Sequence, residues 1–254
     1  MKKVILVLAV LVIAAGAYFM CCGGKNEAAN LTVNKGVLTM ATNASFPPYE
    51  YYEGKKIIGI DAEIAAAIAE KLGLELKIED MEFDSIITSV QSGKADIGLA
   101  GMTMTDERKQ SVNFSDSYAE GIQAIITKEG SGINGPDDLK GKKIGVQLST
   151  TGDIYACDDY GKENVEQFKS GNDAVMALVS GKIDAVIIDN EPAKKYIEGN
   201  EGLVILDTKY VTENYAACLN KDKPELLEKV NAALKELKDA GKLQEIVDKY
   251  ITAK

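Results

Sequence analysis

The sequence predicts an α/β protein built from two similar lobes. Short apolar runs alternate with amphipathic helical patterns, which is the order expected of parallel strands joined by helices. The motif S-G-K-x-D occurs at 92–96 and again at 180–184, each time between a helical pattern and an apolar strand. One copy is explained as a helix end followed by a strand start, but the repeated context indicates a second lobe of similar construction. The chain has 254 residues, 46% of them apolar, which is enough for two packed cores.

In the first half, two helices alternate with three strands. The expected strands are 36–41, 74–78 and 96–101, and the expected helices are 61–72 and 83–92. Ile64 and Ile68 have the i, i+4 spacing of one helix face, and Gly73 and Gly93 follow the two helices as stop signals.

The second half repeats this order and then ends in helices. The strands 143–146 and 186–189 are expected, with helices after Gly152 and before the second S-G-K-x-D copy. Residues 224–251 have two apolar stripes separated by Gly241, which predicts a helical pair. Pro224 suits the first turn of the first of these helices, and we interpret both stripes as core packing.

The first 20 residues have the pattern of an export signal. Lys2 and Lys3 precede an apolar run over 4–20, and Cys21 and Cys22 follow it directly. This resembles a bacterial lipoprotein signal peptide, with lipidation of Cys21 or Cys22 and a polar tether over 21–34. An uncleaved membrane anchor and plain secretion are the alternatives, since about 17 apolar residues is the lower limit for a span. In every case the remainder lies outside the cytoplasm.

Composition excludes several functions. The chain has no histidine, so a His-based catalytic triad and an H-E-x-x-H zinc site are both impossible. With 39 acidic and 29 basic residues, the net charge is −10, which disfavours sequence-independent binding to nucleic acid. We expect no metal or other cofactor, and a monomer.

The single arginine, Arg108, is a candidate ligand-binding residue. Every other basic position is a lysine, and Arg108 lies just after the expected strand 96–101, where open α/β sheets bind ligands. Thr105 is a plausible N-cap, which places Arg108 in the first turn of a helix. A guanidinium binds a carboxylate through two parallel hydrogen bonds and an ammonium cannot. A surface salt bridge within the helix is the alternative.

Two segments of the second half complement Arg108. The strand 143–146 leads into Gln147-Leu148-Ser149-Thr150-Thr151, a hydroxyl-rich turn before a helix, which suits an anion or simply caps the helix. The strand 186–189 ends in Asp189, which can pair with a ligand ammonium or cap the helix that follows. Arg108 and Asp189 together would hold the two charges of an α-amino acid.

Residues from about 36 to 251 resemble the type 3 family of substrate-binding proteins of bacterial ABC transporters, which bind polar amino acids. The matching segments are 59–64 with 68–69, 100–108, 114–116, 138–142, 147–151 and 184–189. The resemblance implies the two-lobed periplasmic-binding-protein fold of type II, with the ligand in the cleft between the lobes. Lobe 1 would comprise 35–117 plus 216–254 and lobe 2 would comprise 122–211, with hinge crossings near 118–122 and 211–215.

The resemblance also implies the contacts of the amino-acid backbone. Arg108 would hold the α-carboxylate with help from Thr103 and the backbone at Thr151. Asp189 and the carbonyl of Gly101 would hold the α-amino group.

Four further positions would form the slot for the ligand side chain. Phe46 and Phe83 would line it, with Asn43 and Gln147 at its end, and Tyr49 is a weaker candidate. Asn43 departs from the family pattern, because many relatives have Asp there. The slot positions supply aromatic faces and amide oxygens without a formal charge, which favours arginine or glutamine, then lysine, with glutamate and aspartate poorest.

The resemblance therefore implies an extracytoplasmic protein that captures a polar amino acid by lobe closure and delivers it to an ABC permease. The alternatives are a cyclohexadienyl dehydratase-like enzyme on the same fold and an extracellular amino-acid sensor. We disfavour the enzyme, because the ligand segments show no unpaired acid other than Asp189, which is already assigned to the ligand ammonium. We expect Cys157 and Cys218 to be unpaired, because a bridge between the lobes would block closure.

Overall fold

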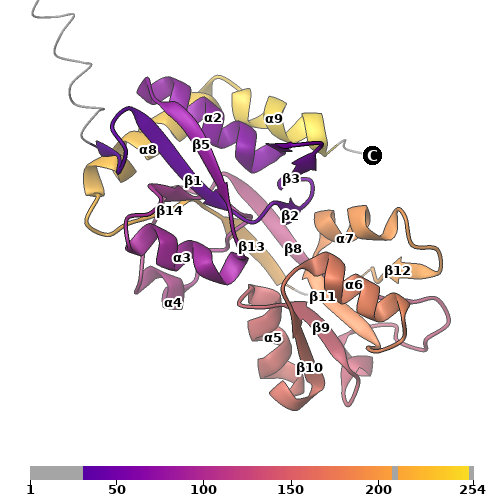
Figure 1. Ribbon diagram of the computed structural model, residues 1–254. Helices are drawn as coiled ribbons and strands as arrows, with labels where there is room; N and C mark the ends of the chain where they lie inside the picture. Colours follow the sequence, from indigo (N-terminus) through magenta and orange to yellow (C-terminus); the bar gives the residue numbers. More distant parts are fainter. Residues whose placement is uncertain (1–30, 208–210, 252–254) are drawn as a thin grey trace, which may run out of the picture.

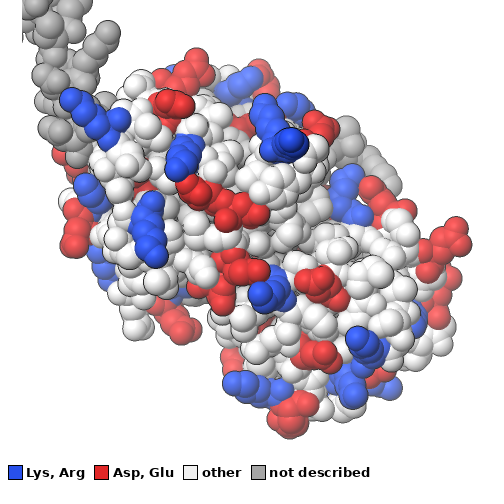
Figure 2. Space-filling model, viewed as in Figure 1, with Lys and Arg blue, Asp and Glu red and all other residues white. Residues whose placement is uncertain are grey.

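Two α/β lobes lie side by side in the computed structural model, which describes residues 31–207 and 211–251 (Figure 1). The expected signal peptide, Cys21 and Cys22 lie outside these residues. None of the described helices has the length and apolar character needed to cross a membrane. Acidic and basic side chains are interspersed over the face of both lobes shown in Figure 2.

The first lobe contains a five-stranded sheet in the order β5-β1-β6-β14-β7. Its strands are β1 (Val37–Thr42), β5 (Glu75–Asp80), β6 (Ile97–Gly98), β7 (Asn113–Phe114) and β14 (Cys218–Leu219). Its helices are α2 (Ile60–Leu72), α3 (Phe83–Gln91), α4 (Asp106–Lys109), α8 (Pro224–Asp239) and α9 (Lys242–Tyr250). A small antiparallel sheet of β2 (Ser45–Phe46), β3 (Glu50–Glu53) and β4 (Lys56–Ile58) follows β1.

The second lobe contains a sheet in the order β10-β9-β11-β8-β12, with β13 also paired to β8. Its strands are β8 (Ala119–Lys128), β9 (Ile144–Gln147), β10 (Val165–Phe168), β11 (Ala185–Asp189), β12 (Leu203–Ile205) and β13 (Val211–Tyr215). Its helices are α5 (Thr151–Tyr160), α6 (Gly171–Val179) and α7 (Asn190–Ile197), with 3-10 turns at Pro136–Leu139 and Lys162–Asn164.

Both sheets are mixed, whereas the sequence pattern predicted parallel sheets. The strands joined by helices are parallel, namely β5-β1-β6 and β10-β9-β11. The antiparallel pairs are those of β8 with β11, β12 and β13 in the second lobe, and those of β14 with β6 and β7 in the first. The expected strand 96–101 is also shorter than predicted. Only β6 forms a ladder, and the chain then turns at Gly101, whose φ is 52°.

The chain passes between the lobes through two adjacent strands. β8 and β13 run antiparallel, with Tyr215 opposite Ala119 and Val211 opposite Gln123. The segments 118–122 and 211–215, expected as crossings, lie in or next to this ladder. After β13 the chain returns to the first sheet as β14, and α8 and α9 then pack on α2.

The C-terminal helices belong to the core, as their apolar stripes predicted. Leu226, Val230, Leu234 and Leu237 of α8 are all buried. Gly241 ends α8 in the left-handed conformation, with φ of 72°, before α9 begins. Cys157 and Cys218 are free thiols, as expected.

The repeated motif has the same structural role in both lobes. Asp96 accepts a hydrogen bond from the Thr39 backbone N–H at 2.8 Å, and its own N–H donates to the Thr39 carbonyl at 2.8 Å. Asp184 makes the equivalent pair with Lys143, again at 2.8 Å for both bonds. Each aspartate thus fixes the start of a neighbouring strand. Asp96 is buried and also accepts from the Val33 N–H at 2.6 Å, whereas Asp184 is exposed.

The two aspartates therefore differ in their expected contribution to stability. Asp96→Ala leaves the buried N–H of Thr39 and the part-buried N–H of Val33 unpaired, and we expect a loss of about 2–3 kcal/mol in the free energy of unfolding. Asp184→Ala is the matched control, with an expected loss below about 1 kcal/mol because water replaces the carboxylate. Urea denaturation measures both, and equal losses would contradict this assignment.

Candidate functional site

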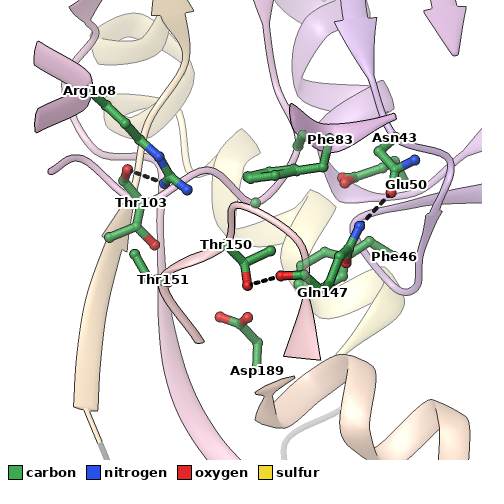
Figure 3. A pocket seen from close by; sticks show the side chains of 12 residues that line it. Asn43, Phe46, Glu50, Phe83, Thr103, Arg108, Gln147, Thr150, Thr151 and Asp189 are labelled. Atoms are coloured by element: carbon green, nitrogen blue, oxygen red, sulfur yellow. Dashed lines mark hydrogen bonds between the residues drawn. The ribbon is translucent and has the colours of Figure 1, made fainter. Parts of the chain in front are cut away.

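A small pocket lies at the carboxyl ends of strands from both lobes (Figure 3). The pocket is lined by Asn43, Phe46, Glu50, Phe83, Ala100, Gly101, Thr103, Arg108, Gln147, Thr150, Thr151 and Asp189. The structure thus brings together all nine positions that the sequence analysis selected, and it adds Glu50, Ala100 and Thr150.

Arg108 lies in the first turn of α4, as the sequence predicted. Its backbone N–H donates to the side chain of the N-cap Thr105 at 3.1 Å. Nη1 of Arg108 donates to the Thr103 carbonyl at 2.7 Å, and Nη2 donates to the Ser149 carbonyl of the second lobe at 2.9 Å. The guanidinium also lies over the ring of Phe83, with Cζ 5.3 Å from its centroid.

The alternative of a surface salt bridge is wrong for Arg108. The side chain is 8% exposed, and it forms no ion pair with any acidic group in the part of the chain that the structure describes. Burial lowers the pKa of Arg108, and the charge of Glu213 opposes this effect. A buried cation that is held only by carbonyls retains an unmet electrostatic demand, which a ligand carboxylate would satisfy.

The hydroxyl-rich turn 147–151 positions the start of α5 against the pocket. Thr150 is the N-cap, since its side chain accepts from the Asp153 N–H at 3.3 Å, so the capping interpretation is correct for this residue. Ser149 has φ of 63°, and its N–H donates to Asp153 at 2.9 Å. The Thr151 hydroxyl donates to Glu213 at 3.0 Å. The first N–H groups of α5 have no acceptor within the helix, which suits an anion.

Asp189 ends β11 at the N-cap position of α7, but its side chain makes no capping hydrogen bond. The capping alternative is therefore wrong. Its carboxylate instead accepts a hydrogen bond from the Tyr215 hydroxyl of β13, and the residue is 7% exposed. Burial and the nearby charge of Glu213 raise the pKa of Asp189 to about 7, although the Tyr215 hydrogen bond lowers it. A ligand ammonium at this point would hold Asp189 in its ionised form.

The slot side chains are already hydrogen-bonded to each other across the two lobes. Nε2 of Gln147 donates to Oδ1 of Asn43 at 3.0 Å and to the Lys169 carbonyl at 3.2 Å. Nδ2 of Asn43 donates to the Met81 carbonyl at 2.9 Å. Phe46 is buried and Phe83 half-buried. Tyr49 does not line the pocket but lies fully buried against Phe46 and Tyr215.

Glu50 is the pocket residue that the sequence analysis missed, and it supplies the formal charge that the predicted slot lacked. It is completely buried, and neither carboxylate oxygen has a hydrogen-bond partner. It reaches the pocket because the β2–β3 hairpin places it directly opposite Phe46 (Figure 3). That hairpin was not predicted. The available signal was an acidic residue between Tyr49 and Tyr51.

The described residues contain no group of three or more Cys, Asp or Glu side chains arranged to hold a metal ion. The pocket instead combines one buried cation, two buried acids and two aromatic rings, a combination that suits a small zwitterion. With two lobes meeting at such a pocket, the molecule has the features of a binding protein that encloses its ligand.

Comparison with known proteins identifies the family. Residues 38–253 match the bacterial extracellular solute-binding proteins, family 3, and the chain belongs to that family. It is 38% identical over 237 residues to the arginine-binding extracellular protein ArtP of Bacillus subtilis, covering 91% of each chain. It is 34% identical over 221 residues to the L-arginine-binding protein of Pseudomonas aeruginosa, covering 82% of this chain and 85% of the relative.

A solved structure of similar sequence has the same fold as this chain. An ancestral arginine-binding protein bound to glutamine superimposes with a TM-score of 0.82 at 40% identity, covering 86% of this chain and 99% of that one. These relatives are binding proteins rather than enzymes.

Arg108→Lys tests the role of the single arginine. The substitution keeps the charge but removes the planar fork, so we expect affinity for every amino-acid ligand to fall by about 2–5 kcal/mol. Titration calorimetry measures this loss. Lys109→Arg, on the exposed side of the same turn, is the matched control and should bind normally. Binding by Arg108→Lys within about threefold of the wild type would refute the carboxylate role.

Proposed function

We propose that this protein captures L-arginine outside the cytoplasm and delivers it to an ABC permease, with glutamine as the second-best ligand. In this proposal, Arg108, Thr103 and the backbone at Thr151 bind the α-carboxylate. Asp189 and the Gly101 carbonyl bind the α-amino group. One observation carries the proposal. The buried guanidinium of Arg108, which forms no ion pair within the described residues, lines the same pocket as the buried carboxylate of Asp189.

Lobe closure around the ligand is supported by direct bonds between the lobes. Arg108 donates to the Ser149 carbonyl at 2.9 Å, and Gln147 donates to Asn43 at 3.0 Å. These bonds join residues that line the pocket or border it, so the pocket is complete only when the lobes are together. We infer that the ligand enters an open form and that closure assembles its contacts.

Glu50 favours arginine over glutamine as the ligand. The predicted slot offered only amide oxygens and aromatic faces, which suited both side chains equally. Glu50 adds a buried carboxylate without a partner, and a guanidinium can pair with it while lying against the Phe46 ring. A glutamate or aspartate ligand would place a second negative charge beside it, which is strongly unfavourable. The arginine-binding names of the relatives agree with this preference.

We further propose that the chain is attached to the membrane by a lipid on Cys21 or Cys22. The basic start, the apolar run and the paired cysteines support this. Replacing both cysteines by serine should move the protein from the membrane fraction to the soluble extracytoplasmic fraction, while replacing Cys157 by serine should not. Continued membrane association of the double variant would favour an uncleaved anchor.

A dehydratase-like enzyme is the alternative to the binding function. The sequence analysis disfavoured a dehydratase because it found no acid in the cleft beyond Asp189, and Glu50 removes that premise. The binding function is supported instead by the relatives, which are binding proteins, and by the cross-lobe contacts that enclose the pocket.

Calorimetry with arginine, glutamine, lysine and glutamate, beside a turnover assay with prephenate and arogenate, tests the proposed function. We expect one site per chain, arginine bound most tightly, glutamate most weakly, and no turnover. At a thousandfold excess over its Kd, a true ligand raises the free energy of unfolding by about 4 kcal/mol, which a thermal melt detects. Tightest binding of glutamate would contradict the slot assignment, and turnover would favour the enzyme.

A further inference from the structure

Two buried carboxyl groups, those of Glu50 and Asp61, lie close together. The Asp61 backbone N–H donates to the carbonyl of Tyr49, the residue before Glu50, at 2.9 Å. Glu50 lies on β3 and Asp61 in the first turn of α2, and both side chains are completely buried. Oδ2 of Asp61 accepts hydrogen bonds from the Gly101 N–H at 2.8 Å and from the Tyr118 hydroxyl at 2.6 Å. The other oxygen of Asp61 and both oxygens of Glu50 have no partner. These three atoms are half of the six unpaired buried side-chain oxygens and nitrogens found in the described residues.

The surroundings do not supply the charge that two carboxylates would need. The charged groups that act most strongly on Glu50 are acidic: Asp61 of α2, Asp189 of β11 and Asp80 of β5. Arg108 of α4 is the basic side chain that lines the same pocket, and its guanidinium donates to the Thr103 and Ser149 carbonyls rather than to Glu50. The tyrosines that face this cluster are Tyr49, Tyr118 and Tyr196, and burial raises the pKa of each hydroxyl, which keeps it neutral. Two adjacent buried carboxylates with which no cation forms an ion pair are very costly. A proton between them would satisfy the unpaired oxygens and remove one charge.

The acid–base properties of the pair agree with this geometry. Burial, followed by the charge of Asp61, raises the pKa of Glu50 well above its usual range. Burial also raises the pKa of Asp61 to about 6, although its hydrogen bonds with Tyr118 and Gly101 lower it. Both effects favour retention of a proton by the pair, as the unpaired oxygens do.

We propose that Glu50 and Asp61 hold one proton between them in the empty site, and that a ligand with a cationic side chain displaces it. A ligand with a neutral polar side chain leaves the proton in place. This inference rests on the proposed function, because it assigns the end of the same slot. The carboxyl O–H bond breaks, the proton passes to the solvent buffer, and the ligand cation takes its place as the partner of the carboxylate.

The direction of the pH dependence follows from the proton balance. The empty protein holds one more proton than its arginine complex, so arginine affinity rises with pH, by about tenfold per unit, until the empty pair itself ionises. Asp189 adds a further proton release, but every amino acid carries the ammonium that causes it. The difference between arginine and glutamine therefore reports on the Glu50–Asp61 pair alone.

Calorimetry at pH 7 in phosphate and in Tris, which differ in ionisation enthalpy, counts the protons released. L-arginine should release about one proton more than L-glutamine. Glu50→Gln keeps the size of the side chain but removes its charge. We expect arginine and glutamine to release equal numbers of protons on binding to this variant. We also expect the ratio of arginine affinity to glutamine affinity to fall at least tenfold. Glu53→Gln, an exposed position on the same strand, is the matched control and should behave as the wild type.

Asp61→Asn provides a second readout. Its amide oxygen can still accept from Gly101 and Tyr118, and its nitrogen can donate to Glu50 without a titratable proton. We expect arginine binding without the additional proton, and a thermal melt verifies that the variant folds. Equal proton release by arginine and glutamine in the wild type would overturn the shared proton while leaving amino-acid capture intact. Failure of both amino acids to bind would overturn the proposed function and this inference together.

Discussion

The arrangement of the site depends on one buried positive charge. Arg108 is held by a carbonyl from each lobe, at Thr103 and at Ser149, and it has no acidic partner among the described residues. Removing a guanidinium from water without an anion is costly, so the folded protein keeps an electrostatic demand that its own side chains leave unmet. In the proposed function a ligand carboxylate supplies the missing charge, and the hydrogen bonds of Arg108 to both lobes couple that contact to the closed arrangement.

Three buried acids in and beside the pocket, Asp189, Asp61 and Glu50, differ in the hydrogen bonds that they accept. Asp189 is hydrogen-bonded by Tyr215 and Gln123, Asp61 by Tyr118 and the Gly101 N–H, and Glu50 has no donor. Hydrogen bonds to a carboxylate stabilise its charged form, so these three acids differ in how readily they ionise. In the proposed function, Asp189 binds the ammonium that all amino acids share, and Glu50 and Asp61 face the side chain that differs between ligands. The protonation of the acids can therefore differ from one ligand to the next.

The sequence predicted the helices and the two main charged residues of the site better than it predicted Glu50 and the order of the strands. Amphipathic periodicity located the helices, and the lone arginine and the strand-end aspartate led to Arg108 and Asp189, because these signals are local. Glu50 was missed because its position depends on a hairpin of two- and four-residue strands, β2 and β3, which leave almost no periodic pattern. The mixed sheet order was missed for a related reason: the strands that join the lobes, β8 and β13, pair over a long sequence separation.

Tyr215 connects the hinge to the site within a single side chain. It lies on β13 opposite Ala119, is completely buried, and its hydroxyl bonds Asp189. Gly121 makes room for it, since a Cβ there would come within 2.1 Å of the hydroxyl oxygen. If Asp189 holds the ligand ammonium as proposed, a change in the angle between the lobes would shift that contact, and the reverse would also hold. Ligand occupancy would then be converted into the relative orientation of two outer surfaces, which a transporter could recognise without touching the ligand.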